Sequence, residues 1–228
     1  MFLYLKILSG LRVPRLPWTG GGTGGLITFV AFLGCGSSIT GIGFTPDLVW
    51  IKRRSQTADH RIFDSVRGPA KILYSNSTAQ ENSDTSSLTS FDDDGFSAIS
   101  DYGTNGNGGN FVAWCWKAGG AAVTNNDGTI TSQVSANQTA GFSIVSYTGD
   151  GNNGDTVGHG LGVEPKLVIS KSRTATGQWL VSTNGISDSD LFLETTGTQD
   201  GFTRVTAYSS TTLTLNSSSA HNSSGVDY

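Results

Sequence analysis

The chain has 228 residues, with 14 Lys and Arg against 18 Asp and Glu, and only 14% of its residues are charged. It is long enough for one large or two small domains with a real core, and its lack of a basic cluster leaves no electrostatic footprint for nucleic acid. Glycine alone supplies 31 residues, and Ser, Thr and Asn are abundant, so the composition favours strands joined by turns over helices.

Residues 1–25 form an atypical leader that ends in the glycine-rich stretch "TGGGTGG". Its apolar run is interrupted by Lys6 and broken by Pro14, and it is far shorter than the roughly 20 residues that a membrane helix needs. A signal peptide carries its positive charge before the apolar stretch, whereas this leader has the opposite order. No other segment predicts a membrane span.

Strands are predicted one after another along the first half of the chain. Each run is rich in Val, Ile, Phe, Tyr, Trp and Thr and is bounded by Gly, Asn, Asp or Pro. The predicted strands are 26–33, 47–53, 60–65, 70–75, 95–100 and 111–117. No segment has a sustained period of 3.6 residues, so the pattern predicts an antiparallel sandwich rather than alternating strands and helices. Two cysteines, Cys35 and Cys115, are too few for a disulfide framework.

The second half of the chain repeats the first. "GIGFTPDLVWIK" (41–52) returns 119 positions later as "GLGVEPKLVISK" (160–171), and six of thirteen aligned residues from Thr40 and His159 onward are identical. Such self-similarity predicts two copies of one structural unit. In the repeated strand, Leu48 and Trp50 occupy the face that stays apolar in both copies, so we predict that this face is the core.

We therefore predict an all-β fold with two tandem antiparallel β-sandwich, jelly-roll-like domains. The predicted boundaries are a leader at 1–25, repeat one at 26–118, a linker at 119–140 and repeat two at 141–228. The linker is expected to carry a short strand at Thr129–Ser135. Repeat two lacks the counterpart of "VAWCW" (112–116), so we expect it to lack its last strand, to leave an edge unpaired and to expose apolar surface.

Motifs for chemistry are weak. "GDGNNG" (149–154) fits the glycine pattern of dinucleotide-binding loops, but no helix can follow it. Asp150, Asn152 and Asp155 carry oxygen atoms that suit a calcium ion, and they equally suit a polar hairpin loop. We keep them as weak ligand-binding candidates. Among the aromatic residues, Trp179 best suits a sugar-binding surface, but a place in the core is the favoured interpretation for it.

Metal, cofactor and catalytic motifs give no positive prediction. His60, His159 and His221 are widely spaced, and no pattern of metal ligands occurs. "FDDDGFS" (91–97) offers adjacent carboxylates, but adjacent strand residues point in opposite directions and "DG" is a turn signal. We predict no catalytic residues, no metal and no cofactor.

Longer phrases of the sequence resemble a known domain. "PDLVWIKRRS", "HRIFDSVRG", "NFVAWCWKAGG" and "DGTITSQVSANQTAGFSIVSYTGDG" are similar to an uncharacterised domain that recurs in virion proteins of tailed phages, especially phages of cyanobacteria and other marine bacteria. The resemblance covers about 27–228. It implies a non-enzymatic virion component, either a tail-fibre or adhesin module that binds host-surface glycans or a capsid decoration.

The resemblance also sets the expected partners and place of action. We expect other virion proteins, further copies of this chain and a host-surface polysaccharide as partners, in a virion assembled in the bacterial cytoplasm. The alternative is a polysaccharide-degrading, tailspike-like glycosidase, which needs two carboxylates that converge in a groove. The acids to place in the structure are Asp64, Glu81, Asp93, Asp188 and Glu194.

Overall fold

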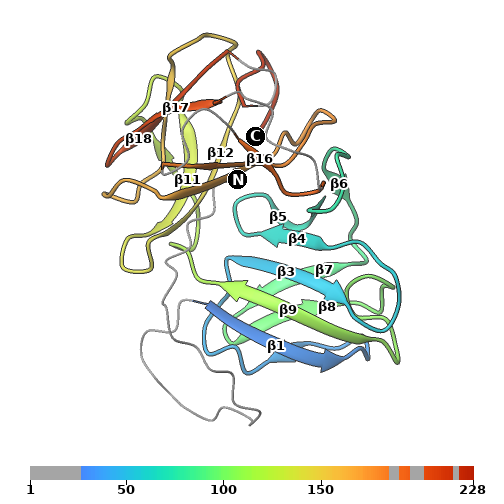
Figure 1. The fold of residues 1–228 in the computed structure, drawn as a ribbon. Helices are drawn as coiled ribbons and strands as arrows, with labels where there is room; N and C mark the ends of the chain where they lie inside the picture. The colour runs from blue at the N-terminus through green and yellow to red at the C-terminus, as the bar shows by residue number, and fades with distance from the viewer. Residues whose placement is uncertain (1–26, 185–189, 196–202, 218–220) are drawn as a thin grey trace.

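The computed structural model describes residues 27–184, 190–195, 203–217 and 221–228. Within these ranges all regular structure is β-strand, and every ladder between named strands is antiparallel (Figure 1). The predicted all-β, antiparallel class is therefore confirmed. The leader at 1–25 lies outside the described residues. In the part of the chain that the structure covers, no helix has the length and apolarity to cross a membrane.

The first half of the chain, called repeat one, is a sandwich of two sheets. The larger sheet has the order β1-β9-β3-β4-β5-β6, and its strands are β1 (Ile27–Leu33), β3 (Leu48–Arg53), β4 (Arg61–Asp64), β5 (Gly68–Tyr74), β6 (Asn82–Ser83) and β9 (Asn110–Trp116). The smaller sheet has the order β2-β8-β7, with β2 (Ile39–Thr40), β7 (Leu88–Asp92) and β8 (Gly95–Ala98). Side chains from both sheets, including Ile51 and Phe96, form one buried core between them.

The second half, called repeat two, is built from three sheets of three strands. These are β10-β11-β12, β14-β15-β16 and β13-β18-β17, and their bounds are β10 (Val123–Asn125), β11 (Ser132–Asn137), β12 (Phe142–Tyr147), β13 (Thr156–Gly158), β14 (Leu167–Ser170), β15 (Leu180–Thr183), β16 (Leu191–Phe192), β17 (Val205–Tyr208) and β18 (Thr212–Leu215). A second core lies between them. The strand expected in the linker is β11, which pairs with β12 along its whole length and so belongs to the sheet.

The two halves share the same strand pairings. β3 pairs with β4 as β14 pairs with β15, so that Leu48 lies opposite Asp64 and Leu167 opposite Thr183, 119 positions further on in each case. The small sheets agree as well, because β2 pairs with β8 as β13 pairs with β18. The turns before β3 and β14 each contain two glycines with positive φ, Gly41 and Gly43 in one and Gly160 and Gly162 in the other. Only glycine adopts such angles without strain, which explains why this stretch is repeated in the sequence.

The hydrogen bonds of one loop are also shared between the halves. Asn105 accepts the amide of Cys35 through Oδ1 and donates Nδ2 to the Ser37 carbonyl. In the second half, Asn222 accepts the amide of Asp150 and donates to the Asn152 carbonyl. Each asparagine therefore closes the loop that follows the first strand of its half.

The end of the described chain occupies the start of the β9 position in repeat two. Phe32 lies opposite Phe111 in repeat one, and Tyr147 and Tyr228 exchange backbone hydrogen bonds of 3.2 and 2.9 Å in repeat two. β9 joins β1 to β3, whereas no described ladder joins β12 to β14.

The predicted exposure of apolar surface in repeat two is nevertheless wrong. Phe142, Ile144 and Ile169 are buried, because they pack against side chains of repeat one that include Leu73 and Trp116. This contact also corrects the predicted core face of β3. Leu48 and Trp50 point away from the sandwich interior and toward repeat two, so the repeated apolar face serves the contact between the halves.

Candidate functional site

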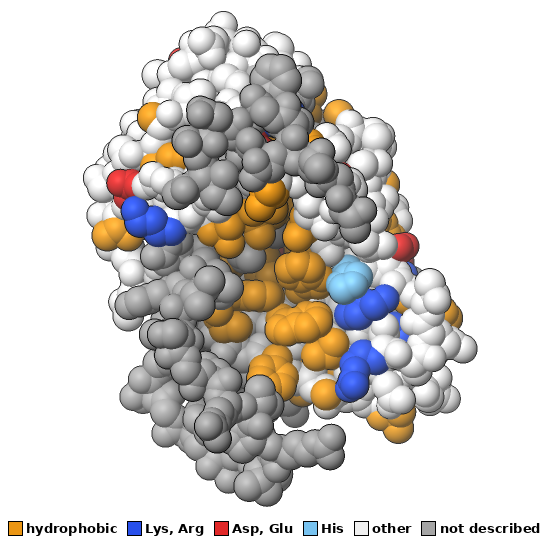
Figure 2. Space-filling model, in the orientation of Figure 1, with side chains coloured by type: hydrophobic (Ala, Val, Ile, Leu, Met, Phe, Trp, Pro, Cys, Tyr) orange, Lys and Arg blue, Asp and Glu red, His pale blue; other side chains and the backbone are white. Residues whose placement is uncertain are grey.

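A row of three aromatic side chains crosses the outer face of the large sheet. Phe29 on β1, Trp114 on β9 and Trp50 on β3 are consecutive partners in the strand register. Phe29 is 63% exposed, and both tryptophans are half-buried. We call these three residues the aromatic row. Figure 2 shows hydrophobic side chains gathered on this side of the molecule, with basic and histidine side chains beside them.

The strand period positions the aromatic row. Alternate residues of a strand share a face, so the inward positions of β9 are the buried Phe111, Ala113 and Cys115, and Trp114 points outward. β9 is central in its sheet, but its outer face is only half-covered at Trp114.

The tryptophans are held rigidly at the end of the row that lies nearer repeat two. The ring centroids of Trp50 and Trp114 are 6.2 Å apart with an interplanar angle of 63°, an edge-to-face contact that aromatic pairs prefer. Trp50 also lies 6.5 Å from Trp116, which stacks on Phe142 of repeat two at 6.4 Å. The aromatic row therefore continues directly into the core between the halves and is preorganised by it.

Polar groups border the aromatic row on the side of β3. The indole Nε1 of Trp50 donates to Nδ1 of His60 at 3.3 Å. Lys52 is the next outward residue on β3, and its Nζ donates to the Ala58 carbonyl. Hydrogen-bonding groups of His60 and Lys52 therefore lie beside Trp50, at one end of the aromatic row.

The protonation state of His60 follows from its surroundings. Burial lowers the pKa of His60 first, and the positive charge of Lys52 lowers it further, against a smaller opposite effect of Asp59. His60 is therefore neutral at physiological pH. Since Nδ1 accepts the indole hydrogen, the ring proton is assigned to Nε2, which makes Nε2 a donor.

A row of aromatic side chains with nearby donors suits a carbohydrate. The faces of sugar rings present C–H groups that pack on aromatic rings, and their hydroxyl groups need a few well-placed polar partners. The aromatic row was not predicted, because the strand pattern assigns Trp50 to the core. The available signal was the alternation in β1, where Phe29 falls on the face opposite to the partly buried Val30 and Phe32.

Trp179, the tryptophan considered for a sugar-binding surface, lies elsewhere. Its side chain is fully buried in the core between the halves, and its Nε1 donates to the Tyr74 carbonyl at 2.8 Å. Its own amide donates to the Glu194 carboxylate. The structure therefore places Trp179 in the core, as the favoured interpretation of the sequence has it, and leaves it no surface for a ligand.

Asp150, Asn152 and Asp155 do lie together in one loop, but their polar atoms are used within it. The Asp150 carboxylate accepts the amide and side-chain nitrogen of Asn152 and Nδ2 of Asn222, each at 3.0 Å. The backbone hydrogen bond from Asn152 is the main cause that lowers the pKa of Asp150 to about 2, and Asp155 contributes. Asp155 also accepts Thr129 Oγ1 at 2.8 Å. Since repeat one closes the same loop without acids, these contacts serve the turn.

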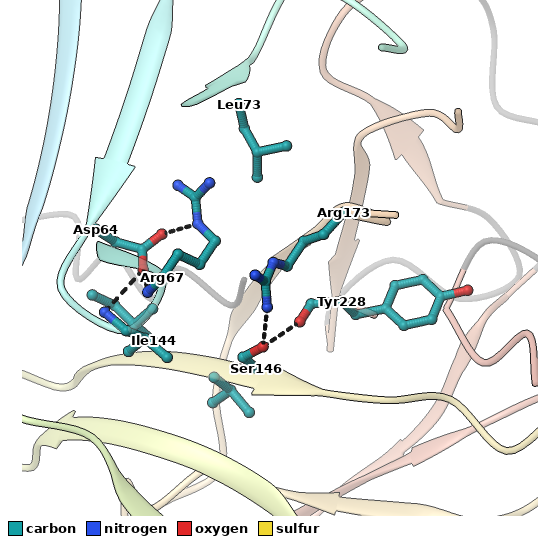
Figure 3. Close-up of a pocket in the computed structure, with 9 residues that line it drawn as sticks. Asp64, Arg67, Leu73, Ile144, Ser146, Arg173 and Tyr228 are labelled. Carbon is teal, nitrogen blue, oxygen red and sulfur yellow. Dashed lines mark hydrogen bonds and ion pairs between the residues drawn. The ribbon is translucent and has the colours of Figure 1, made fainter. Parts of the chain in front are cut away.

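A charged cluster lies between the halves, around a small pocket (Figure 3). Arg67 contacts the carboxylates of Asp64 and Glu81, and Arg173 from repeat two binds Glu81 at 2.9 Å. Arg173 also donates to Ser146 Oγ, which in turn donates to the Tyr228 carbonyl. The pocket has a volume of about 10 Å³, the lower limit for a single water molecule.

Two of the acids considered for the glycosidase alternative, Asp64 and Glu81, lie in this cluster. Asp64 and Glu81 share Arg67, so they are ion-paired rather than free. Burial alone would raise the pKa of Glu81, but the hydrogen bonds and charges of Arg173 and Arg67 outweigh it, and the pKa is lowered. A general acid needs a raised pKa and room for a sugar, and this site offers neither. Asp93 is on an exposed turn, and Asp188 lies outside the described residues.

The histidines are also dispersed. His221 is fully buried with Nδ1 2.8 Å from Ser170 Oγ, and His159 accepts the amide of Leu161. Among the described residues, no group of three or more His, Cys, Asp or Glu side chains could hold a metal ion. Cys35 is exposed, Cys115 is buried, and both are free thiols.

Comparison with known proteins places the chain in a family. The model of a family described as a domain of unknown function, DUF7483, matches residues 26–228, and the chain belongs to that family. The match begins where the described structure begins and covers both halves. No curated protein and no solved structure matches the chain.

Proposed function

We propose that this member of the DUF7483 family is a non-enzymatic structural module of a phage virion that attaches the particle to a host-surface glycan. The observation that supports attachment is the aromatic row, with Phe29 largely exposed and Trp50 and Trp114 held by the core between the halves. The resemblance of the sequence to tailed-phage virion domains supports the setting, on a tail fibre or as a capsid decoration.

In this proposal the sandwich supplies a rigid surface and the aromatic row supplies the contact. Sugar rings pack on Phe29, Trp114 and Trp50, and the Nε2 hydrogen of His60 and the Lys52 ammonium group donate to hydroxyl or acidic groups of the glycan. Because Trp50 and Trp114 already pack against the core between the halves, binding costs little entropy in these two side chains. No proton transfer or bond cleavage is involved.

The test is affinity electrophoresis of the full chain through gels that contain purified bacterial surface polysaccharides. We expect at least one polysaccharide to retard the protein. Phe29→Ala and Trp114→Ala should each weaken binding by about tenfold, because truncated aromatic anchors cost on the order of 1–2 kcal/mol. Phe29 is exposed, so its variant tests binding without disturbing the core.

Tyr102→Ala is the matched control, because Tyr102 is also an exposed aromatic residue (51%) and lies outside the aromatic row. It should be retarded like the unmodified protein. The proposal fails if no polysaccharide retards the protein, or if Phe29→Ala and Trp114→Ala are retarded as strongly as Tyr102→Ala.

A further inference from the structure

The outermost strand of the large sheet, β1, has an edge without a partner among the described strands. β1 stands at the end of the sheet order and pairs only with β9 (Figure 1). Gly34, which follows β1, exchanges backbone hydrogen bonds with Gly108 and Gly109 on the β9 side. Because hydrogen-bond direction alternates along an antiparallel strand, Ile27, Phe29, Ala31 and Leu33 direct their N–H and C=O groups to the open edge.

The sequence of this edge carries none of the features that normally protect an edge strand. Such strands are usually short, or contain Lys, Pro or a bulge. β1 is seven residues long, reads "ITFVAFL", and pairs with β9 in unbroken register. Its outward side chains Ile27, Phe29 and Leu33 are 43%, 63% and 63% exposed. On β1, backbone groups that have no partner among the described residues therefore lie beside exposed apolar side chains.

Repeat two shows which kind of partner binds the equivalent edge. The counterpart of β1 is β12, and its corresponding edge is covered by β11. The residues of β12 that direct their backbone groups to β11 are Phe142, Ile144 and Ser146, which correspond to Ile27, Phe29 and Ala31. The same edge thus binds an antiparallel strand in one half of the molecule and is open in the other.

We propose that the open edge of β1 binds β1 of a second copy of this chain, in an antiparallel dimer with its twofold axis at Val30. This register places Ile27 opposite the partner subunit's Leu33 and Phe29 opposite the partner subunit's Ala31. In each copy these four residues, Ile27, Phe29, Ala31 and Leu33, direct their backbone groups to the open edge. The edge is therefore self-complementary, as a twofold interface requires.

The chemistry of β1 favours a second copy of the chain as the partner of its open edge. β1 contains no charged residue, so two copies meet without repulsion and form cross-strand pairs of apolar side chains, which stabilise sheets. The dimer would join two large sheets into one and bring two aromatic rows onto one surface. The dimer does not depend on glycan binding, so the two proposals can fail separately.

The test is the mass of the full chain in solution, measured by light scattering after gel filtration over a wide range of concentration. We expect a dimer with twice the 23.9 kDa chain mass. Ala31→Pro removes an N–H that faces the open edge and leaves the β9 ladder intact. Phe29→Lys places a charge on the interface. Each variant should raise the dimer dissociation constant by at least about tenfold.

Thr124→Pro is the matched control. Thr124 lies on the edge strand β10, and its N–H points away from β11 by the same alternation, so this variant should remain dimeric. If circular dichroism shows that Ala31→Pro fails to fold, the dimer dissociation constant of Phe29→Lys alone tests the proposal. A monomer at every concentration, or a dimer that survives both β1 variants, would overturn the proposal. So would a monomer that dimerises only after residues 1–25 are removed, because the leader would then be the occupant of the edge.

Discussion

Acid should destabilise the protein through His221. This side chain is fully buried, its Nδ1 lies 2.8 Å from Ser170 Oγ, and its backbone carbonyl accepts the Tyr147 hydroxyl at 2.6 Å. Burial is the main cause that lowers the pKa of His221 to about 3, and the positive charge of Arg204 adds to it. The folded protein therefore keeps His221 neutral over a range of pH in which the unfolded chain protonates it.

The sign and size of the effect follow from linkage. A lowered folded-state pKa gives stability that is fully present above the ordinary value of 6.5 and is lost as pH falls toward 3. At about pH 4.5, two pH units below 6.5, the loss is up to about 2.7 kcal/mol, since each pH unit corresponds to about 1.36 kcal/mol. That is a large share of the 5–15 kcal/mol that is usual for a native protein, roughly a fifth to a half.

Urea unfolding at about pH 7 and pH 4.5 measures this loss. We expect His221→Gln to be less stable than the unmodified protein at neutral pH, but to lose about 2–3 kcal/mol less on acidification, because it has no buried imidazole to protonate. His60→Gln is the control, since His60 is only half-buried, and it should keep most of the acid sensitivity. Equal acid losses in the unmodified protein and His221→Gln would refute the reasoning.

Three further predictions concern the fold. Trp179→Ala should lower the free energy of unfolding by about 3–5 kcal/mol, because it leaves a cavity between the halves; a loss below 1 kcal/mol in urea would contradict the packing. Asn105→Ala and Asn222→Ala should each cost about 1–3 kcal/mol, because each leaves loop groups unpaired, and strongly unequal losses would weigh against equivalent loops. A thiol reagent should modify Cys35 in the native protein but Cys115 only after unfolding, because burial raises the pKa of Cys115 to about 12; rapid native labelling of both would contradict its burial.

Much of the fold could be predicted from the sequence because its signals are local. The six strands expected in the first half correspond to β1, β3, β4, β5, β8 and β9, since each is rich in β-branched or aromatic residues between turn residues. Three strands were missed: β2 and β6, because two residues carry no period, and β7, because its run "LTSFD" has only two large apolar residues among polar ones. The strand expected at Thr129–Ser135 lies slightly later, in β11.

The candidate site could not be predicted, because it depends on which faces the halves bury. Leu48 and Trp50 read as sandwich core, since nothing in a strand period tells an inner face from an outer face that a second domain covers. For Trp179 the core was the favoured interpretation, but only its contact with Tyr74, more than a hundred positions away, shows that this core lies between the halves. Such contacts follow from tertiary packing and leave no local pattern.

Immunogold electron microscopy of purified particles, from a phage whose genome carries this sequence, tests the virion-attachment proposal most directly. Antibodies against the full chain should label intact particles at a fixed position, on the tail or on the capsid, and should block adsorption to host cells. Unlabelled particles, with the protein found only in the soluble lysate, would contradict the proposal.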